Sequence, residues 1–331
     1  MKKLKIEFSE KLLTKNAGLY LLALFSEKLS IKLLFKTNIS IKRGSTAKYQ
    51  VPDVLTMLIM SIFTGAKHIS HLALLRHDEV IRTYYNWQDF PDDRTIGRIF
   101  KLFTFKHCTE LSDIETLLRK KVWSRKWFGR ITFDMDSTVK GVYGNQEGAE
   151  KGYNSKKRGQ KSYHPLLCYV AENRECFHNW FRSGSSYTSN GVLEFTKECF
   201  SKIPKRVWKI FVRADSGFFS GAFIEYLERN KCEYLIKVKL KNLTSLLLRQ
   251  KWRKVKNTEG TETTTFMHQC NKWNKARNFY AVRKIVELPD EKMLIPIPKY
   301  EYFCYVSNCN LTPMKAHRCY GQRATSENWI E

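Results

Sequence analysis

The sequence has few acidic residues, no closely paired cysteines and no long apolar run. Its nine cysteines are scattered singly, without a Cys-x-x-Cys pair, which indicates reduced thiols. Histidines such as His164 and His178 also lack the spacing of zinc ligands. The longest apolar stretch, residues 54–66, is shorter than the roughly 20 residues of a membrane span. The first residues lack the apolar run of a signal peptide. We therefore expect a soluble cytoplasmic protein without a membrane partner.

Basic residues, in contrast, are abundant. The chain carries 58 Lys and Arg against 32 Asp and Glu, a formal net charge of +26. Such an excess favours a polyanionic partner such as DNA, because Lys and Arg that neutralise phosphates release condensed counterions. Charge alone also fits a ribosomal protein or one bound at a membrane surface. The 331 residues, 43% of them hydrophobic, allow more than one domain with a packed core.

The first part of the chain has helical periodicity. Apolar residues recur at helical spacing over residues 51–66. A second such pattern, over 96–103, follows the candidate caps Asp92 and Asp93. We interpret residues 1–125 as a helical DNA-binding region.

The periodicity then becomes that of strands. Residues 131–136 alternate, which places Asp134 and Asp136 on one face, and the strand patterns at 166–171 and 176–181 indicate three consecutive antiparallel strands. A helix from an Asn190 cap leads to a strand that ends at Asp215, and a second helix leads to a strand over 234–238. The order β-β-β-α-β-α-β predicts the α/β class with a mixed sheet over residues 126–239. Such sheets present the carboxyl ends of parallel strands to ligands.

The last part of the chain returns to strands and then to a helix. Residues 240–315 contain strand patterns at 263–267, 279–286 and 302–306, and we interpret them as an inserted β-rich subdomain. Residues 316–331 are predicted to begin the final core helix. Tyr320, Arg323 and Glu327 share one face of it, because they are three and four residues apart.

Three carboxylates that are distant in sequence can meet in this topology. Asp136 and Asp215 end strands, and Glu327 lies on the last helix. Three carboxylates in one pocket repel one another unless cations share it. Mg²⁺ prefers hard oxygen ligands and keeps water positions open, so a pair of ions flanking a scissile phosphate suits such a pocket.

The segments around these residues resemble bacterial insertion-sequence transposases of the Asp-Asp-Glu class, which have a ribonuclease-H-like core. Residues 133–138 resemble the first motif of that group, 144–154 and 162–167 its loop and second strand, and 213–218 its second acidic motif. Tyr320, Arg323 and Glu327 are similar to three members of its third motif. The fourth, a Lys seven positions after the Glu, would fall beyond Glu331, so we expect a truncated copy.

The resemblance implies roles for these residues. It makes Asp136, Asp215 and Glu327 the catalytic residues and the ligands of two Mg²⁺ ions, for which Mn²⁺ can substitute. It also implies that Arg323 contacts DNA phosphate and that Tyr320 orients the carboxylate or the DNA. The implied partners are the terminal inverted repeats of the element and target DNA, bound by a homodimer in a synaptic complex associated with the nucleoid.

Each residue also has a plainer interpretation. Asp134 shares a face with Asp136 and is the alternative ligand, while Glu327 could be a solvated charge paired with Arg323. The basic cluster is interpreted either as a phosphate grip or as a solvated loop, and consists of Lys156, Lys157, Arg158 and Lys161. Trp252 and Trp273 suit base stacking, but packing is the favoured interpretation.

These features together predict a DNA transposase that cuts at the ends of an insertion element and joins the 3′ ends to target DNA. Two alternatives stay open. One is a ribonuclease-H-like nuclease that hydrolyses but does not join. The other is an inactive, truncated DNA-binding remnant.

Overall fold

The computed structural model describes residues 14, 16–152, 154, 157–287 and 298–323. The chain divides into two compact units, residues 1–126 and 127–331. Within the described residues, no helix has the length and apolar character needed to cross a membrane. The nine cysteines are all free thiols, as their single spacing predicts.

The described residues of the first unit form only helices and connecting turns. Asp78 caps α4 by accepting from the Ile81 amide, and Asp92 caps α5 by accepting from the Thr95 amide. Pro52 occupies the first turn of α3, where its missing N–H leaves no hydrogen bond unmade. The helices are α1 (Ala17–Leu29), α2 (Ile31–Asn38), α3 (Val51–Phe63), the 3₁₀ helix η1 (Ile69–His77), α4 (Glu79–Tyr85), α5 (Asp93–Phe100) and α6 (Phe105–Trp123).

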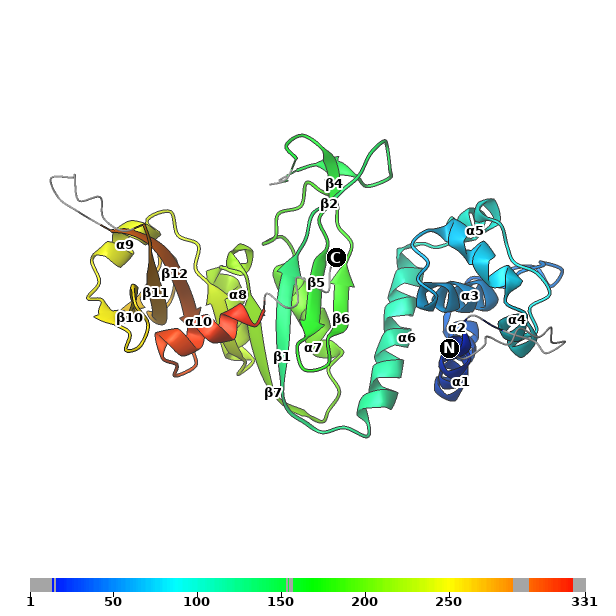
Figure 1. Cartoon of the computed structure of the whole chain (residues 1–331), viewed down its shortest axis with the longest axis horizontal. Helices are drawn as coiled ribbons and strands as arrows, with labels where there is room; N and C mark the ends of the chain where they lie inside the picture. The colour runs from blue at the N-terminus through cyan, green and yellow to red at the C-terminus, as the bar shows by residue number, and fades with distance from the viewer. Residues whose placement is uncertain (1–13, 15, 153, 155–156, 288–297, 324–331) are drawn as a thin grey trace, which may run out of the picture. The chain divides into compact units, whose positions relative to one another are not determined.

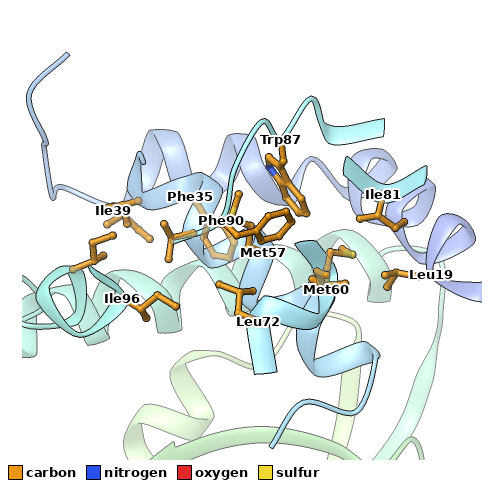
Figure 2. Close-up of a cluster of buried hydrophobic side chains, with 14 of the residues drawn as sticks. Leu19, Phe35, Ile39, Met57, Met60, Leu72, Ile81, Trp87, Phe90 and Ile96 are labelled. Atoms are coloured by element: carbon orange, nitrogen blue, oxygen red, sulfur yellow. The ribbon is translucent and has the colours of Figure 1, made fainter. Parts of the chain in front are cut away.

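One apolar cluster holds these helices together. Figure 2 shows Met57 and Met60 of α3 among side chains from several other segments. Trp87 and Phe90, which lie between α4 and α5, pack edge to face with ring centroids 5.6 Å apart. Burying such large side chains supplies about 1.5–3 kcal/mol each relative to exposure. The first unit therefore has a core of its own.

A nine-stranded mixed sheet forms the centre of the second unit (Figure 1). Its strand order is β6-β5-β1-β7-β8-β12-β11-β10-β9. Strands β1, β7 and β8 are mutually parallel, and the other neighbouring pairs are antiparallel. The strands are β1 (Phe128–Ser137), β5 (Leu166–Val170), β6 (Glu175–Trp180), β7 (Val207–Ala214), β8 (Glu233–Lys237), β9 (Arg253–Lys254), β10 (Thr261–His268), β11 (Arg277–Glu287) and β12 (Lys299–Ser307).

Helices pack on both faces of this sheet. Phe133 of β1 contacts Phe200 of α7 (Val192–Ser201), and Phe200 stacks on Tyr226 of α8 (Gly221–Arg229). On the opposite face, Phe211 of β7 shares an apolar cluster with Ala316 of α10 (Pro313–Gly321). A short helix, α9 (Leu243–Leu248), follows β8. The face that carries Phe211 also carries Asp134 and Asp136, because side chains alternate along a strand.

The segment of the chain that connects β1 to β5 forms a small three-stranded sheet, which the sequence did not predict. Its order is β2-β4-β3, from β2 (Lys140–Gly141), β3 (Glu150–Lys151) and β4 (Lys161–Tyr163). Strands of two or three residues are too short for a period-2 pattern to be recognised.

The element order β-β-β-α-β-α-β predicted for the larger sheet is present, with strand ends within a few residues of those expected. The segments at 263–267, 279–286 and 302–306 are strands, but they do not form a separate inserted sheet. Instead, β12 pairs with β8 at three residues and continues the same sheet. Periodicity identifies strands, but it does not say which strand pairs with which.

Two predicted helix boundaries differ. The cap of α7 is Gly191, not Asn190, and its φ of 71° is a left-handed conformation that glycine adopts without strain. The last helix begins at Pro313, capped by Thr312, so that Arg323 follows its end. Residues 324–331, with Glu327, lie outside the described residues.

Candidate active site at the ends of two parallel strands

Asp136 and Asp215 lie side by side where two parallel strands end. The register of β1 and β7 pairs Met135 with Ala214, and an aspartate follows each of these two residues in the chain. Adjacent strands are about 4.8 Å apart, and residues in register point to the same face. Parallel pairing thus brings together two carboxylates that are 79 positions apart in the sequence.

Asp136 is buried, and its carboxylate forms an ion pair and a hydrogen bond. Its Oδ1 lies 2.6 Å from Arg323 Nη2, and the same oxygen accepts from the Ser137 amide at 2.8 Å. Arg323 is itself 3% exposed. The carboxylate is therefore compensated by a guanidinium that comes from just beyond α10.

Asp215 begins a short 3₁₀ helix, η2 (Ser216–Phe218), directly after β7. Its Oδ1 accepts from the Gly217 amide at 3.0 Å. A Cβ on Gly217 would lie 2.8 Å from the Thr188 side chain, so only glycine fits between this turn and the segment 183–190. The absence of a side chain at Gly217 lets that segment closely approach the ends of β1 and β7, where Asp136 and Asp215 lie; we call this place the acidic edge.

Hydrogen bonds hold the segment 183–190 close to the ends of β1 and β7. The hydroxyls of Thr188 and Ser137 share a hydrogen bond of 2.9 Å. Arg182 donates to the carbonyls of Tyr187 and Asn190 at 3.1 and 2.7 Å, and His164 Nδ1 donates to the Ser186 carbonyl at 2.6 Å. Burial lowers the pKa of His164, although the hydrogen bond to Ser186 and the charge of Asp215 oppose that shift.

Asp134, the alternative ligand, is fully buried and paired with Arg213. The guanidinium donates from Nε to Oδ1 at 2.6 Å and from Nη2 to Oδ2 at 2.7 Å. Burial raises the pKa of the Asp134 carboxyl, and the hydrogen bonds from Arg213 oppose this shift. Because an arginine keeps its proton, we interpret the contact as an ion pair. A metal ion at Asp134 would have to compete with a guanidinium at both oxygens.

The described members of the predicted basic cluster lie in β4 and in the loop between β3 and β4. Lys157 donates from Nζ to the Tyr143 hydroxyl at 2.9 Å, and Lys161 donates to Asn145 Oδ1 at 2.8 Å. Lys157 and Arg158 are exposed, whereas Lys156 lies outside the described residues. The backbone of Gly152 packs so closely on Gly184 that a Cβ would lie 1.7 Å from the Gly184 carbonyl oxygen. This contact ties the small sheet to the segment 183–190.

Tyr320 and the two tryptophans are packing residues in this structure. The Tyr320 ring lies 4.8 Å from that of Tyr305, centroid to centroid. Trp273 is buried against Phe219 and Arg277, and Trp252 donates to the Leu247 carbonyl beneath the Arg283 guanidinium. Base stacking by either tryptophan would need these contacts to open.

The whole chain matches the model of one protein family. The model described as "Transposase DDE domain group 1" matches residues 1–331. The chain belongs to this family of DDE transposases.

The chain is similar to a piggyBac transposase synaptic complex with hairpin DNA, at 13% identity and a TM-score of 0.42, over 99% of this chain and 61% of that one. It is also similar to a Mos1 transposase paired-end complex with left transposon end, at 10% identity and a TM-score of 0.24, over 69% and 68% of the two chains. The chain thus spans less than two thirds of the piggyBac chain. The comparison with curated proteins gave no match.

DDE transposases generally use divalent metal ions, so the residues at the acidic edge can be tested for fit. Two neighbouring carboxylates at strand ends are hard oxygen donors of the type that Mg²⁺ takes. Within the described residues, no group of three or more His, Cys, Asp or Glu side chains is placed to hold a metal ion. The aspartates therefore fit as part of a ligand set, and Glu327, the third predicted ligand, lies outside the described residues.

Sequence analysis missed the partners of the acidic residues. It did not predict that Arg213 pairs with Asp134, nor that segment 183–190 contacts Ser137. A signal for the first was present, since Arg213 lies two residues before Asp215 on a strand otherwise rich in apolar residues, where a charge requires a buried partner. No sequence pattern marks the second contact.

Proposed function

We propose that this chain is a DNA transposase that cleaves phosphodiester bonds at the ends of an insertion element and transfers the strand into target DNA. The observation that supports this most strongly is the register of β1 and β7, which sets Asp136 and Asp215 side by side. Family membership supplies the reaction class.

In this proposal Asp136, Asp215 and Glu327 hold two Mg²⁺ ions, with Mn²⁺ as a substitute. When bound, the ions supply an activated water or 3′-hydroxyl and stabilise the leaving oxygen. The chain's own residues fix the carboxylates: the Ser137 amide orients Asp136, and the Gly217 amide orients Asp215. No protein side chain has to act as a covalent nucleophile.

The DNA partner is proposed from charge and position. The net charge of +26 favours a polyanion, and Lys157 and Arg158 are exposed in the loop between β3 and β4. Lys156 and Lys161 belong to the same cluster, and Arg323 and Tyr320 are proposed to contact DNA near the cleaved bond.

We further propose that the helical unit recognises the element ends, that residues 126–239 form a ribonuclease-H-like core, and that two copies act together.

The test is metal-dependent nicking of DNA that carries the element ends. Asp136→Asn and Asp215→Asn should each abolish nicking in Mg²⁺ or Mn²⁺ while gel-shift binding in EDTA is retained. Glu287→Gln, which changes an exposed carboxylate on β11, is the matched control and should cleave normally. Unchanged nicking by either aspartate variant would reject the assignment.

The same assay separates the alternative functions. A labelled 3′-hydroxyl end that joins target DNA identifies a transposase, whereas nicking without joining identifies a nuclease. DNA binding without metal-dependent nicking would identify a non-catalytic DNA-binding protein.

A further inference from the structure

A buried charged network connects the carboxylate-bearing strands to α10. Besides its two hydrogen bonds to Asp134, Arg213 donates from Nη1 to the Cys319 carbonyl at 2.8 Å and to Gln322 Oε1 at 3.3 Å. Arg213 resides on β7, Asp134 on β1 and Cys319 in the last turn of α10. We call these four residues, Asp134, Arg213, Cys319 and Gln322, the Arg213 bridge.

Apolar side chains pack beside the bridge. Phe211 and Leu235 lie on the same face as Arg213 and belong to the cluster that packs against Ala316 of α10. An apolar pair of similar volume would pack equally well here, since replacing a buried ion pair by hydrophobic residues is often neutral or stabilising. Stability alone therefore gives no reason for an arginine at this position.

A guanidinium at this position fixes the direction of its hydrogen bonds. Its donors lie in one rigid plane, so bidentate pairing with Asp134 fixes where Nη1 points. In this structure Nη1 points at the Cys319 carbonyl, one of the last carbonyls of α10, which lack partners within the helix. A lysine could satisfy Asp134 or Cys319 but would not hold both in one geometry.

The bridge lies one step along the strands from the acidic pair. Asp134 and Asp136 share a face with Arg213, because Asp134 pairs with Arg213 and precedes Asp136 by two residues, and Asp215 follows Arg213 by two. Cys319 precedes Arg323 by four residues, and Arg323 contacts Asp136. Fixing the last turn of α10 therefore also fixes the approach of Arg323 to the site.

We propose that the Arg213 bridge positions the end of α10 over Asp136 and Asp215, with Asp134 and Arg213 acting as positioning residues and not as metal ligands. The structural part of this inference stands on the contacts themselves. Its catalytic consequence rests on the proposed function.

The structural part is tested by hydrogen exchange of the full chain. The double variant Asp134→Asn/Arg213→Gln replaces the ion pair by a neutral, hydrogen-bonding pair that does not reach Cys319. Amides in peptides covering residues 318–323 should exchange at least about tenfold faster, while those of β1 and β7 keep their protection. Unchanged exchange over 318–323 would overturn the proposal.

A matched control is available in the same unit. Arg277 pairs in a bidentate way with Glu228, at 2.8 and 3.0 Å, and joins β11 to α8 instead of α10. Glu228→Gln/Arg277→Gln should leave exchange over residues 318–323 unchanged. Equal acceleration in this control would also overturn the proposal. Should the first double variant fail to fold, Arg213→Lys keeps the charge opposite Asp134 and carries the same expectation.

The catalytic part has its own readout. Asp134→Asn/Arg213→Gln should still nick DNA but need a several-fold higher Mg²⁺ concentration for half-maximal rate, whereas Asp136→Asn should not nick at any Mg²⁺ concentration. Complete loss of nicking in the folded double variant would make Asp134 a ligand and reject the positioning role. If the unmodified chain does not nick DNA, the proposed function fails, but the hydrogen-exchange result still decides the structural part.

Discussion

Arg323 Nη2 lies 2.6 Å from Asp136 Oδ1, and both side chains are buried. Breaking a buried pair from one side leaves an uncompensated charge, which costs about 3–5 kcal/mol. We therefore expect Arg323→Ala to lower the free energy of unfolding by about 3 kcal/mol in EDTA, and by less in millimolar Mg²⁺, because a cation can then compensate Asp136. Urea unfolding with and without Mg²⁺ measures both values.

The exposed Arg229, which pairs with the half-buried Glu225 four residues earlier, provides the control for that experiment. Arg229→Ala should cost less than about 1 kcal/mol, irrespective of Mg²⁺. An equal loss for Arg323→Ala in both conditions would argue against cation binding at Asp136.

The close approach of Gly152 to Gly184 predicts a steric effect at a distance from the aspartates. In Gly152→Ala the new Cβ would overlap the Gly184 carbonyl oxygen, so the backbone must shift, at a cost of about 2 kcal/mol. Limited proteolysis should then cut residues 140–163 faster than in the unmodified chain. Gly129→Ala, whose Cβ meets no atom within 4 Å, should behave like the unmodified chain.

Electrostatic binding of DNA by the small sheet predicts a change in salt dependence. Each phosphate contact contributes about 0.9 to the slope of log affinity against log salt. Lys157→Ala/Arg158→Ala should therefore reduce that slope by about 2, measured by fluorescence anisotropy over a salt series. Lys299→Ala changes an exposed lysine on β12 that pairs with Glu287 of β11, and it should leave the slope unchanged. A slope that stays the same in the double variant would place the DNA elsewhere.

The buried His164 and the half-buried His317 predict a loss of stability in acid. Burial lowers the pKa of His164 and of His317 below the ordinary value of 6.5. The unfolded chain then binds these protons more readily, so stability should fall as the pH decreases from 6.5 through the lowered folded values. Melting temperatures between about pH 7 and pH 5 should fall less steeply in His164→Gln/His317→Gln. An equally steep fall in the double variant would contradict this prediction.

Much of the fold could be predicted because its elements carry local patterns. The helix from Val51 and the strand that carries Asp136 have clear periods of 3.6 and 2. Pairing partners could not be predicted, so β12 was not assigned to the sheet of β8. Pairing depends on side chains that meet only after folding.

The acidic residues of the site could be predicted from the sequence, but their partners could not. Asp136 and Asp215 were proposed from motif and strand position, and the structure places them next to each other. The sequence offered no choice between Asp134 and Asp136 by periodicity, because both lie on one face of β1. What differs is the partner, Arg213 for one and Arg323 for the other, and those contacts span 79 and 187 positions of the chain.

This long separation also bears on how the protein is made. Asp134 and Asp136 leave the ribosome well before Arg213, and Arg213 well before Arg323, so the acidic residues cannot be buried with their partners until almost all of the second unit has been synthesised. Pairings of such high sequence separation form late in folding, because a long loop must close first. The site therefore cannot assemble before Arg323 has been synthesised, and the proposed DNA-cutting activity requires the second unit to be folded around all of these residues.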